Sequence, residues 1–313
     1  FNSYRGFESL SLRHNIECSM NTPKVIHWFR QDLRLSDNPA LFEAAKNSSI
    51  LPIYILDNIN SKELAMGEAS RFWLHHSLNS LNKSLDQNLS IYSGDPIKVI
   101  LDIIDRLDIK EIFWNRCYEP WRINRDTHIK KELESKGIKV NTLNGSLLWE
   151  PWTIKKGDGT PYKVFTPYFR KGCLLSDEPR KPISTPTNLD LFNDNNSLKD
   201  INALSLLPST KWDIKMKSFW NIGELGANNR LTEFLNNGVE NYKEGRNIPS
   251  KPFVSKLSPH LHFGEISPNQ AWYAAKKKGD DTNIDHFCSE LGWREFSYTQ
   301  LYFNPKLPKN NLQ

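Results

Sequence analysis

VIHWFRQDLRLSDNPALFEAAKNSSILPIYIL, residues 25–56, holds two short apolar runs separated by a polar loop and a helical stretch. The first run, Val25 to Phe29, predicts a buried strand. Asn38 to Lys46 predicts a helix entered through Pro39. Ile50 to Leu56 predicts the next strand. A strand, a helix and a strand in this order indicate a parallel sheet.

The same alternation continues through the first half of the chain. Further strands are predicted at 89–94, 111–115 and 139–143, and further helices at 71–87, 96–107 and 122–136. Five strands separated by helices predict a doubly wound, five-stranded α/β domain at 23–150.

Ligands of such sheets collect beyond the carboxyl ends of the strands. The first such end is the loop from Arg30 to Asn38. It has neither the GxGxxG pattern nor the Walker glycines, so a standard dinucleotide or P-loop site is not predicted. Its two arginines and two aspartates could equally form a salt-bridged loop network.

The second half of the chain has a different composition. Residues 176–202 are rich in Pro, Ser, Thr, Asn and Asp, which predicts a connector within an interdomain region at 151–215. Residues 216–313 then have helical periodicity, so we expect a mostly α second domain. The apolar residues from Gly223 to Tyr242 fit one amphipathic helix.

ELGWREFSYTQLY, residues 290–302, predicts a helix with two distinct faces. Glu290, Trp293, Arg294 and Ser297 share one face, and Phe287, Leu291, Tyr298 and Leu301 form a stripe that can face a core. The polar face has the residue types of a surface for stacking and hydrogen bonding. The alternative is a partly buried helix with a Glu–Arg ion pair at i, i+4.

The segment VSKLSPHLHFGEISP, residues 254–268, places Ser255, Lys256 and Ser258 just before a possible helix start at Pro259. Hydroxyls, amides and a cation at a helix N-terminus suit a phosphate. Capping of the helix by Ser258 is the simpler alternative.

Composition excludes several other classes of protein. The chain has 313 residues, enough for two domains, and a net charge of only +5, too small for nonspecific coating of nucleic acid. No apolar run of about 18 residues exists, so no membrane span is predicted. The four cysteines (Cys18, Cys117, Cys173, Cys288) lie far apart, which argues against disulfides and indicates a cytoplasmic protein. The pairs His75–His76 and His260–His262 have no acidic or Cys ligands nearby, so no metal site is predicted.

The first residues have neither an apolar core nor regular periodicity. We expect translation to start at Met20, and residues 1–22 to be a non-native or disordered extension.

Five motifs occur in a fixed order: WFRQDLRLSDNPAL (28–41), NRCYEPW (115–121), YKVFTPY (162–168), SKLSPHLHFGEISP (255–268) and ELGWREF (290–296). Together they resemble the photolyase and cryptochrome family, and most closely its microbial cyclobutane-dimer photolyases. The resemblance spans nearly the whole chain after Met20.

The resemblance implies an N-terminal α/β antenna domain and a C-terminal helical domain that holds FAD. It also implies an enzyme, a deoxyribodipyrimidine photo-lyase, in which reduced FAD excited by light gives an electron to a cyclobutane pyrimidine dimer flipped out of UV-damaged DNA. The implied partner is DNA, and the protein is expected to be a monomer. The alternatives are a cryptochrome-like blue-light photoreceptor and a photolyase for (6-4) photoproducts.

The resemblance also carries site residues over. The catalytic pair is Glu290, which hydrogen-bonds the dimer, and Trp293, on which the dimer stacks. The implied FAD-binding residues are Tyr242, Val254, Ser255, Lys256, Leu257, Ser258 and Arg294. DNA binding falls to Arg246, Glu290, Leu291, Gly292, Trp293, Arg294, Glu295, Phe296 and Ser297.

Several positions depart from the family pattern. Val254 stands where Thr is common, Asn269 where Arg is common, and Gly292 where Ala or Ile is usual. Trp121 and Arg122 stand where folate-binding relatives have Asn and Glu, so folate, deazaflavin, another antenna chromophore and an empty pocket all stay open. Relatives continue beyond the position of Gln313. We therefore expect a truncated chain with an incomplete helical domain that binds FAD weakly or not at all.

Overall fold

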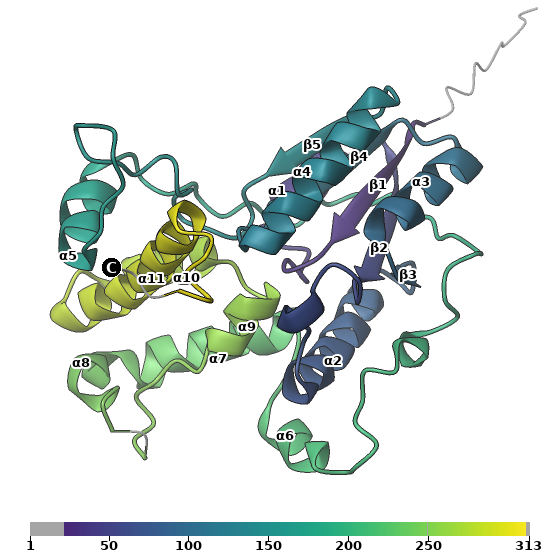
Figure 1. The fold of residues 1–313 in the computed structure, drawn as a ribbon. Coiled ribbons are helices and arrows are strands. Elements are labelled where there is room, and N and C mark those ends of the chain that lie inside the picture. Colours follow the sequence, from purple (N-terminus) through teal and green to yellow (C-terminus); the bar gives the residue numbers. More distant parts are fainter. Residues whose placement is uncertain (1–21, 249, 311–313) are drawn as a thin grey trace, which may run out of the picture.

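The computed structural model describes residues 22–248 and 250–310. Its first part is a parallel sheet in the order β3-β2-β1-β4-β5, which confirms the predicted five-stranded fold (Figure 1). The strands are β1 Lys24–Phe29, β2 Ser49–Leu56, β3 Ser90–Ser93, β4 Glu111–Asn115 and β5 Lys139–Leu143. The predicted extension 1–22, except its last residue, lies outside the described residues, as does Cys18.

Helices cover both faces of this sheet. Because side chains alternate along a strand, β1 supplies Val25 and Phe29 to one core and Ile26 and Trp28 to another. The first core contains residues of α1 and α2, and the second contains residues of α3 and α4. The helices are α1 Pro39–Ala44, α2 Glu68–Ser84, α3 Pro96–Leu107 and α4 Pro120–Ser135, with a 3₁₀ turn at Lys62–Leu64. The doubly wound prediction is therefore confirmed.

A long irregular segment joins the sheet to the later helices. It contains α5 Phe165–Pro167, a π-helical turn Tyr168–Gly172, 3₁₀ turns Cys173–Leu175 and Ile201–Leu204, and α6 Asp213–Phe219. Its middle runs along the sheet edge, where the Phe192 amide donates to the Ile50 carbonyl at 3.0 Å and the Leu198 amide donates to the Ile91 carbonyl at 2.8 Å. These hydrogen bonds tie the connector to the α/β part.

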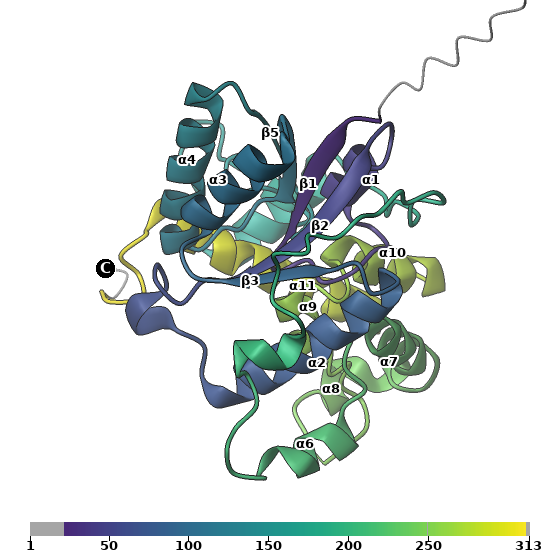
Figure 2. The same ribbon diagram turned by 90° about the vertical axis from the view of Figure 1, so that its right-hand side faces the viewer.

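The second part is helical, as predicted. Its helices are α7 Glu224–Asn237, α8 Tyr242–Gly245, α9 Ser258–Phe263, α10 Pro268–Lys278 and α11 Thr282–Phe303, with a 3₁₀ turn at Val239–Asn241. Figures 1 and 2 show α9 beside α2, at the boundary of the two parts. There the indole nitrogen of Trp73 donates to Glu265 at 3.0 Å, and Glu265 also bonds His260.

One local prediction and one alternative are wrong. The single helix from Gly223 to Tyr242 is interrupted at Gly238, where a Cβ atom would lie 3.1 Å from the Phe234 ring and 3.2 Å from the Pro252 carbonyl. Ser258 does not cap α9, because it is the first residue of that helix and no side chain caps the terminus.

Arg34 joins the two parts from inside the protein. It is buried, and its guanidinium donates to the carbonyls of Gly264 at 2.8 Å, Gly145 at 2.7 Å and Asp37 at 2.7 Å. Asp37 in turn accepts from Arg180 and from the Ser267 hydroxyl. The loop after β1 is therefore a polar network, the alternative that its sequence left open.

Candidate functional site

Helix α11 begins at a strong cap and presents the two predicted faces in part: Tyr298 and Leu301 are only partly buried, and Arg294 turns away from the polar face. The Asp281 carboxylate accepts from the amides of Asn283 at 2.7 Å and Ile284 at 3.1 Å, which fixes the start of the helix. Phe287 and Leu291 are buried in the core of the helical part, as the apolar stripe predicts. The opposite face is the one that carries the candidate site.

Glu290 of α11 forms an ion pair with Arg246, which directly follows α8. Each side chain is about one-third exposed, so solvent reaches the pair. The Arg246 guanidinium also lies 5.6 Å from the Tyr242 ring. Burial raises the pKa of Tyr242 to about 12, so its hydroxyl is neutral. The i, i+4 ion pair between Glu290 and Arg294 is not formed, because Arg246 takes the partner position.

Trp293 lies one turn away on the same helix and is 44% exposed. One face of its indole stacks on Phe165 of α5, with ring centroids 3.8 Å apart and an angle of 12° between the planes. Phe296 meets the indole edge-on at 5.8 Å. The Ser297 hydroxyl donates to the Trp293 carbonyl at 2.8 Å and so stays on the helix surface.

Three of the predicted DNA contacts instead face the protein interior. Leu291 is 4% exposed, Gly292 is buried against the Phe169 ring, and Glu295 is fully buried. The Glu295 carboxylate accepts from the amides of Leu148 at 2.9 Å and Trp149 at 3.2 Å. These three side chains are therefore not available to DNA in this structure.

Arg294 also faces the α/β part. Its guanidinium donates to the Ser146 carbonyl at 2.8 Å and contacts Glu295 at 3.2 Å. Burial of Glu295 raises the pKa of that carboxyl to about 7, although Arg294 and the two amides act in the opposite direction. The pair fastens α11 to the loop after β5.

The predicted flavin segment lies before α9. Val254, Ser255 and Lys256 are partly exposed, Ser258 is exposed and Leu257 is buried. Lys256 has a positive φ of 54°, and its ammonium lies 4.9 Å from the Phe219 ring of α6. Two hydroxyls and a cation are therefore accessible within four residues, a donor set that suits an anionic group.

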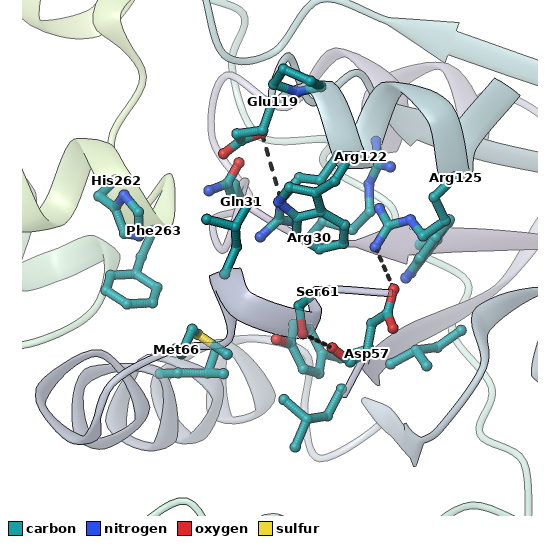
Figure 3. Close-up of a pocket in the computed structure, with 18 of the residues that line it drawn as sticks. Arg30, Gln31, Asp57, Ser61, Met66, Glu119, Arg122, Arg125, His262 and Phe263 are labelled. Atoms are coloured by element: carbon teal, nitrogen blue, oxygen red, sulfur yellow. Dashed lines mark hydrogen bonds and ion pairs between the residues drawn. The ribbon is translucent and has the colours of Figure 1, made fainter. Parts of the chain in front are cut away.

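A cavity of about 330 Å³ opens at the carboxyl ends of β1 and β2, between α4 and α9 (Figure 3). Its walls include aromatic rings and guanidinium groups in alternation. The Arg30 guanidinium lies 4.8 Å from the Trp28 ring, and Arg125 lies 5.0 Å from Trp28 and 5.1 Å from Trp121. The Arg122 guanidinium lies 4.6 Å from the Trp121 ring.

Hydrogen-bond donors at this cavity lack partners. Among the described residues, the indole nitrogen of Trp28 and Nε of Arg30 are buried without a hydrogen bond. Nε of Arg122 lies 3.5 Å from Glu119, too far for a strong bond. The aromatic rings and guanidinium groups of this wall suit a flat ligand that stacks on them. The rule for strand ends predicts the location, but Trp121 and Arg122 were identified from the resemblance only.

No cluster of three or more potential metal ligands is found in residues 22–248 and 250–310. His260, of the second histidine pair, instead bonds the buried Glu265. Over the same described residues, every helix is too short or too polar to span a bilayer.

Comparison with known proteins identifies the fold. The family model described as DNA photolyase matches residues 25–186. A deoxyribodipyrimidine photo-lyase of Agrobacterium fabrum is 37% identical over 94% of this chain and 62% of its own length, and cryptochrome-2 of Arabidopsis thaliana is 31% identical over 88% and 48%. The crystal structure of a class III photolyase from Agrobacterium tumefaciens superposes with a TM-score of 0.88 at 36% identity, covering 95% of this chain and 62% of that one.

This chain thus spans about three-fifths of the photolyase lengths that it matches. The match of the family model covers more than half of the chain, and it includes the sheet, the first part of the connector and the cavity walls on α4. The chain belongs to the DNA photolyase family.

Proposed function

We propose that this protein is a light-dependent DNA repair enzyme that acts on cyclobutane pyrimidine dimers flipped out of UV-damaged DNA. The observation that carries the proposal is the arrangement of Glu290, Arg246 and Trp293. The Glu290 carboxyl group and the open indole face of Trp293 lie within one turn of α11, and the Arg246 cation, which follows α8, pairs with Glu290 on the same accessible surface. These are the groups that a flipped, planar and hydrogen-bonding substrate on a phosphate backbone needs.

Each of the three residues has a separate role. Trp293 offers the face that Phe165 does not cover, and stacking of a base on an aromatic ring contributes roughly 1–3 kcal/mol toward the cost of flipping. Glu290 hydrogen-bonds the exposed edge of the bases. Arg246 binds a backbone phosphate through its guanidinium donors.

FAD is the proposed redox cofactor, and it supplies the electron that opens the dimer when it is bound and reduced. Ser255, Lys256 and Ser258 offer hydroxyls and a cation to its diphosphate, and Tyr242, Val254 and Leu257 are the other chain positions assigned to this site. Arg294 is given a supporting role. Its hydrogen bond to the Ser146 carbonyl holds in place the helix that carries Glu290 and Trp293.

The cavity on α4 is proposed to hold a second, light-harvesting chromophore. Its Trp–Arg wall favours a flat heteroaromatic group, such as a folate or a deazaflavin. The test is titration of the purified protein with methenyltetrahydrofolate and with a deazaflavin, monitored by fluorescence. Trp121→Ala is expected to weaken binding, and Trp152→Ala, in a separate cavity beside β4 and β5, is the matched control.

The repair proposal is tested by first measuring by gel filtration whether the protein retains FAD, and then by illuminating the loaded, reduced protein with an oligonucleotide that contains one thymine dimer. Conversion to thymine is expected in the light and not in the dark, and Glu290→Ala should slow it. A cryptochrome-like photoreceptor is the second candidate, because cryptochromes are also among the relatives. Intact reduced flavin without any repair would favour that candidate.

A further inference from the structure

Three aromatic rings from two distant parts of the chain form one parallel stack. Trp293 lies on Phe165 with centroids 3.8 Å apart and planes at 12°, and Phe165 lies on Phe169 with centroids 5.6 Å apart and planes at 10°. Phe296 meets Trp293 and Phe165 edge-on, at 5.8 Å and 5.9 Å. The order of the stack is therefore Trp293, Phe165 and Phe169, from the surface to the core.

Burial changes along this stack. Phe169 is 1% exposed and belongs to the core of the helical part, Phe165 is partly exposed, and Trp293 is 44% exposed. The innermost ring is fixed by its packing, with Trp272 edge-on at 6.4 Å. The fixed Phe169 ring supports Phe165, and Phe165 supports the exposed indole of Trp293. An isolated surface tryptophan would lack this support.

Gly292 gives the stack its room. A Cβ atom at this position would lie 2.5 Å from the Phe169 ring, closer than side chains tolerate. Glycine within a helix destabilises the helix relative to alanine. The position nevertheless carries glycine in the middle of α11, next to Trp293, and its contact with Phe169 supplies the reason.

We propose that Phe165 is a positioning residue for the damaged base: it covers one face of Trp293 and holds the other face ready to stack, and Gly292 admits the Phe169 ring that supports it. This inference rests on the proposed function and adds Phe165 and Gly292 to the residues that select the substrate. An indole that is already ordered loses little rotamer freedom when a base stacks on it, which favours the flipped dimer by about 2- to 10-fold over a mobile indole.

The first test measures the dissociation constants of the 313-residue protein for a dimer-containing and an undamaged oligonucleotide. The preference for the dimer is the dissociation constant for undamaged DNA divided by that for dimer-containing DNA. Phe165→Leu is expected to reduce this ratio by about 2- to 10-fold, and Phe165→Tyr, which keeps a flat ring, should preserve it. Val164→Ala, at an exposed neighbouring position, is the control. An unchanged ratio in Phe165→Leu overturns the inference while the repair proposal stands, whereas no preference in the unmodified protein overturns both.

The second test needs no DNA. The protein is labelled with 5-fluorotryptophan, and the Trp293 resonance is identified by its loss in Trp293→Phe. Ring currents from Phe165 should shift this resonance, and Phe165→Leu should move it toward the value of an exposed tryptophan. Gly292→Ala, which removes no ring, should also move it by crowding Phe169. A resonance that neither variant moves would contradict the stack, even where Phe165→Leu itself is too unstable for binding studies.

Discussion

Arg246 and Glu290 are bonded to each other across α8 and α11, although each is assigned a different part of the DNA substrate. Exposed ion pairs of this kind contribute at most about 1 kcal/mol, so exchanging the pair for a phosphate and a base costs little. In the free protein each member of the pair is held by the other. DNA competes with this pair for Arg246. Substitutions of the two residues should therefore change the affinity for undamaged DNA in opposite directions.

Arg246→Gln should weaken binding to any oligonucleotide and lower the salt dependence of log K by about 0.9, the value of one phosphate contact. Glu290→Gln should strengthen binding to undamaged DNA, because it frees Arg246 and removes a negative charge, while it reduces the preference for a dimer. Fluorescence anisotropy between 50 and 200 mM salt, roughly the range in which such contacts are measured, checks both. Lys110→Gln, at the amino end of β4, removes one charge elsewhere and should change neither quantity.

Trp293→Ala should reduce discrimination of dimer over undamaged DNA by roughly 1–3 kcal/mol, because the stacking surface is lost. Affinity for undamaged DNA should change much less, since phosphate contacts carry most of it. Competition binding with the two oligonucleotides measures the difference. Equal loss of affinity for both would mean that Trp293 supports the surface and does not stack on the substrate.

The regular elements could be predicted from the sequence wherever local pattern decides. The bounds of α3, β4 and β5 were predicted correctly, because Pro96 begins the helix, a compact apolar run forms β4, and β5 combines β-branched Val and Thr after a turn. The break at Gly238 could not, since it depends on contacts with Phe234 and Pro252. Local periodicity carries no information on such tertiary packing.

The candidate site was predictable only in part, for the same reason. Spacing places Glu290 and Trp293 on one face of α11, but their partners come from other segments: Arg246 follows α8, and Phe165 lies in α5. Spacing also cannot tell an exposed acidic residue from a buried one. Glu295 has the same residue type as Glu290, yet it is enclosed by the loop after β5.

His27, in the middle of β1, should make the protein less stable in acid. It is fully buried, and neither ring nitrogen has a hydrogen-bond partner among the described residues. Burial lowers its pKa to about 4, an effect that Asp32 opposes and Arg30 adds to. The unfolded chain binds the proton near pH 6.5, so stability is lost as pH falls from about 6.5 to 4, by about 3 kcal/mol in all.

Denaturant unfolding across this pH range checks the prediction. His27→Leu should remove that part of the pH dependence. The same substitution at His128, which is exposed on α4, is the matched control and should leave the profile parallel to that of the unmodified protein. A parallel profile for His27→Leu would assign the acid sensitivity to other groups.

Glu295 should act in the opposite direction. Its pKa is raised from 4.5 to about 7 by burial, so the folded protein holds a proton there that the unfolded chain releases. The stability that this proton gives is complete below pH 4.5 and is lost as pH rises through 7, again by about 3 kcal/mol. The contributions of His27 and Glu295 therefore partly cancel between pH 4.5 and 6.5, and the profile of the unmodified protein hides both.

Glu295→Gln separates the two contributions. The amide still offers an acceptor to the Leu148 and Trp149 backbone but cannot ionise. The free energy of unfolding of the variant should therefore fall furthest below that of the unmodified protein at pH 5, and this difference should shrink by about 3 kcal/mol by pH 8. Its own profile should rise more steeply with pH, because the contribution of His27 is no longer opposed. Glu244→Gln, at an exposed position of α8, serves as control. A constant difference between Glu295→Gln and the unmodified protein from pH 5 to 8 would mean that Glu295 is ionised throughout, held by Arg294 and the two amides.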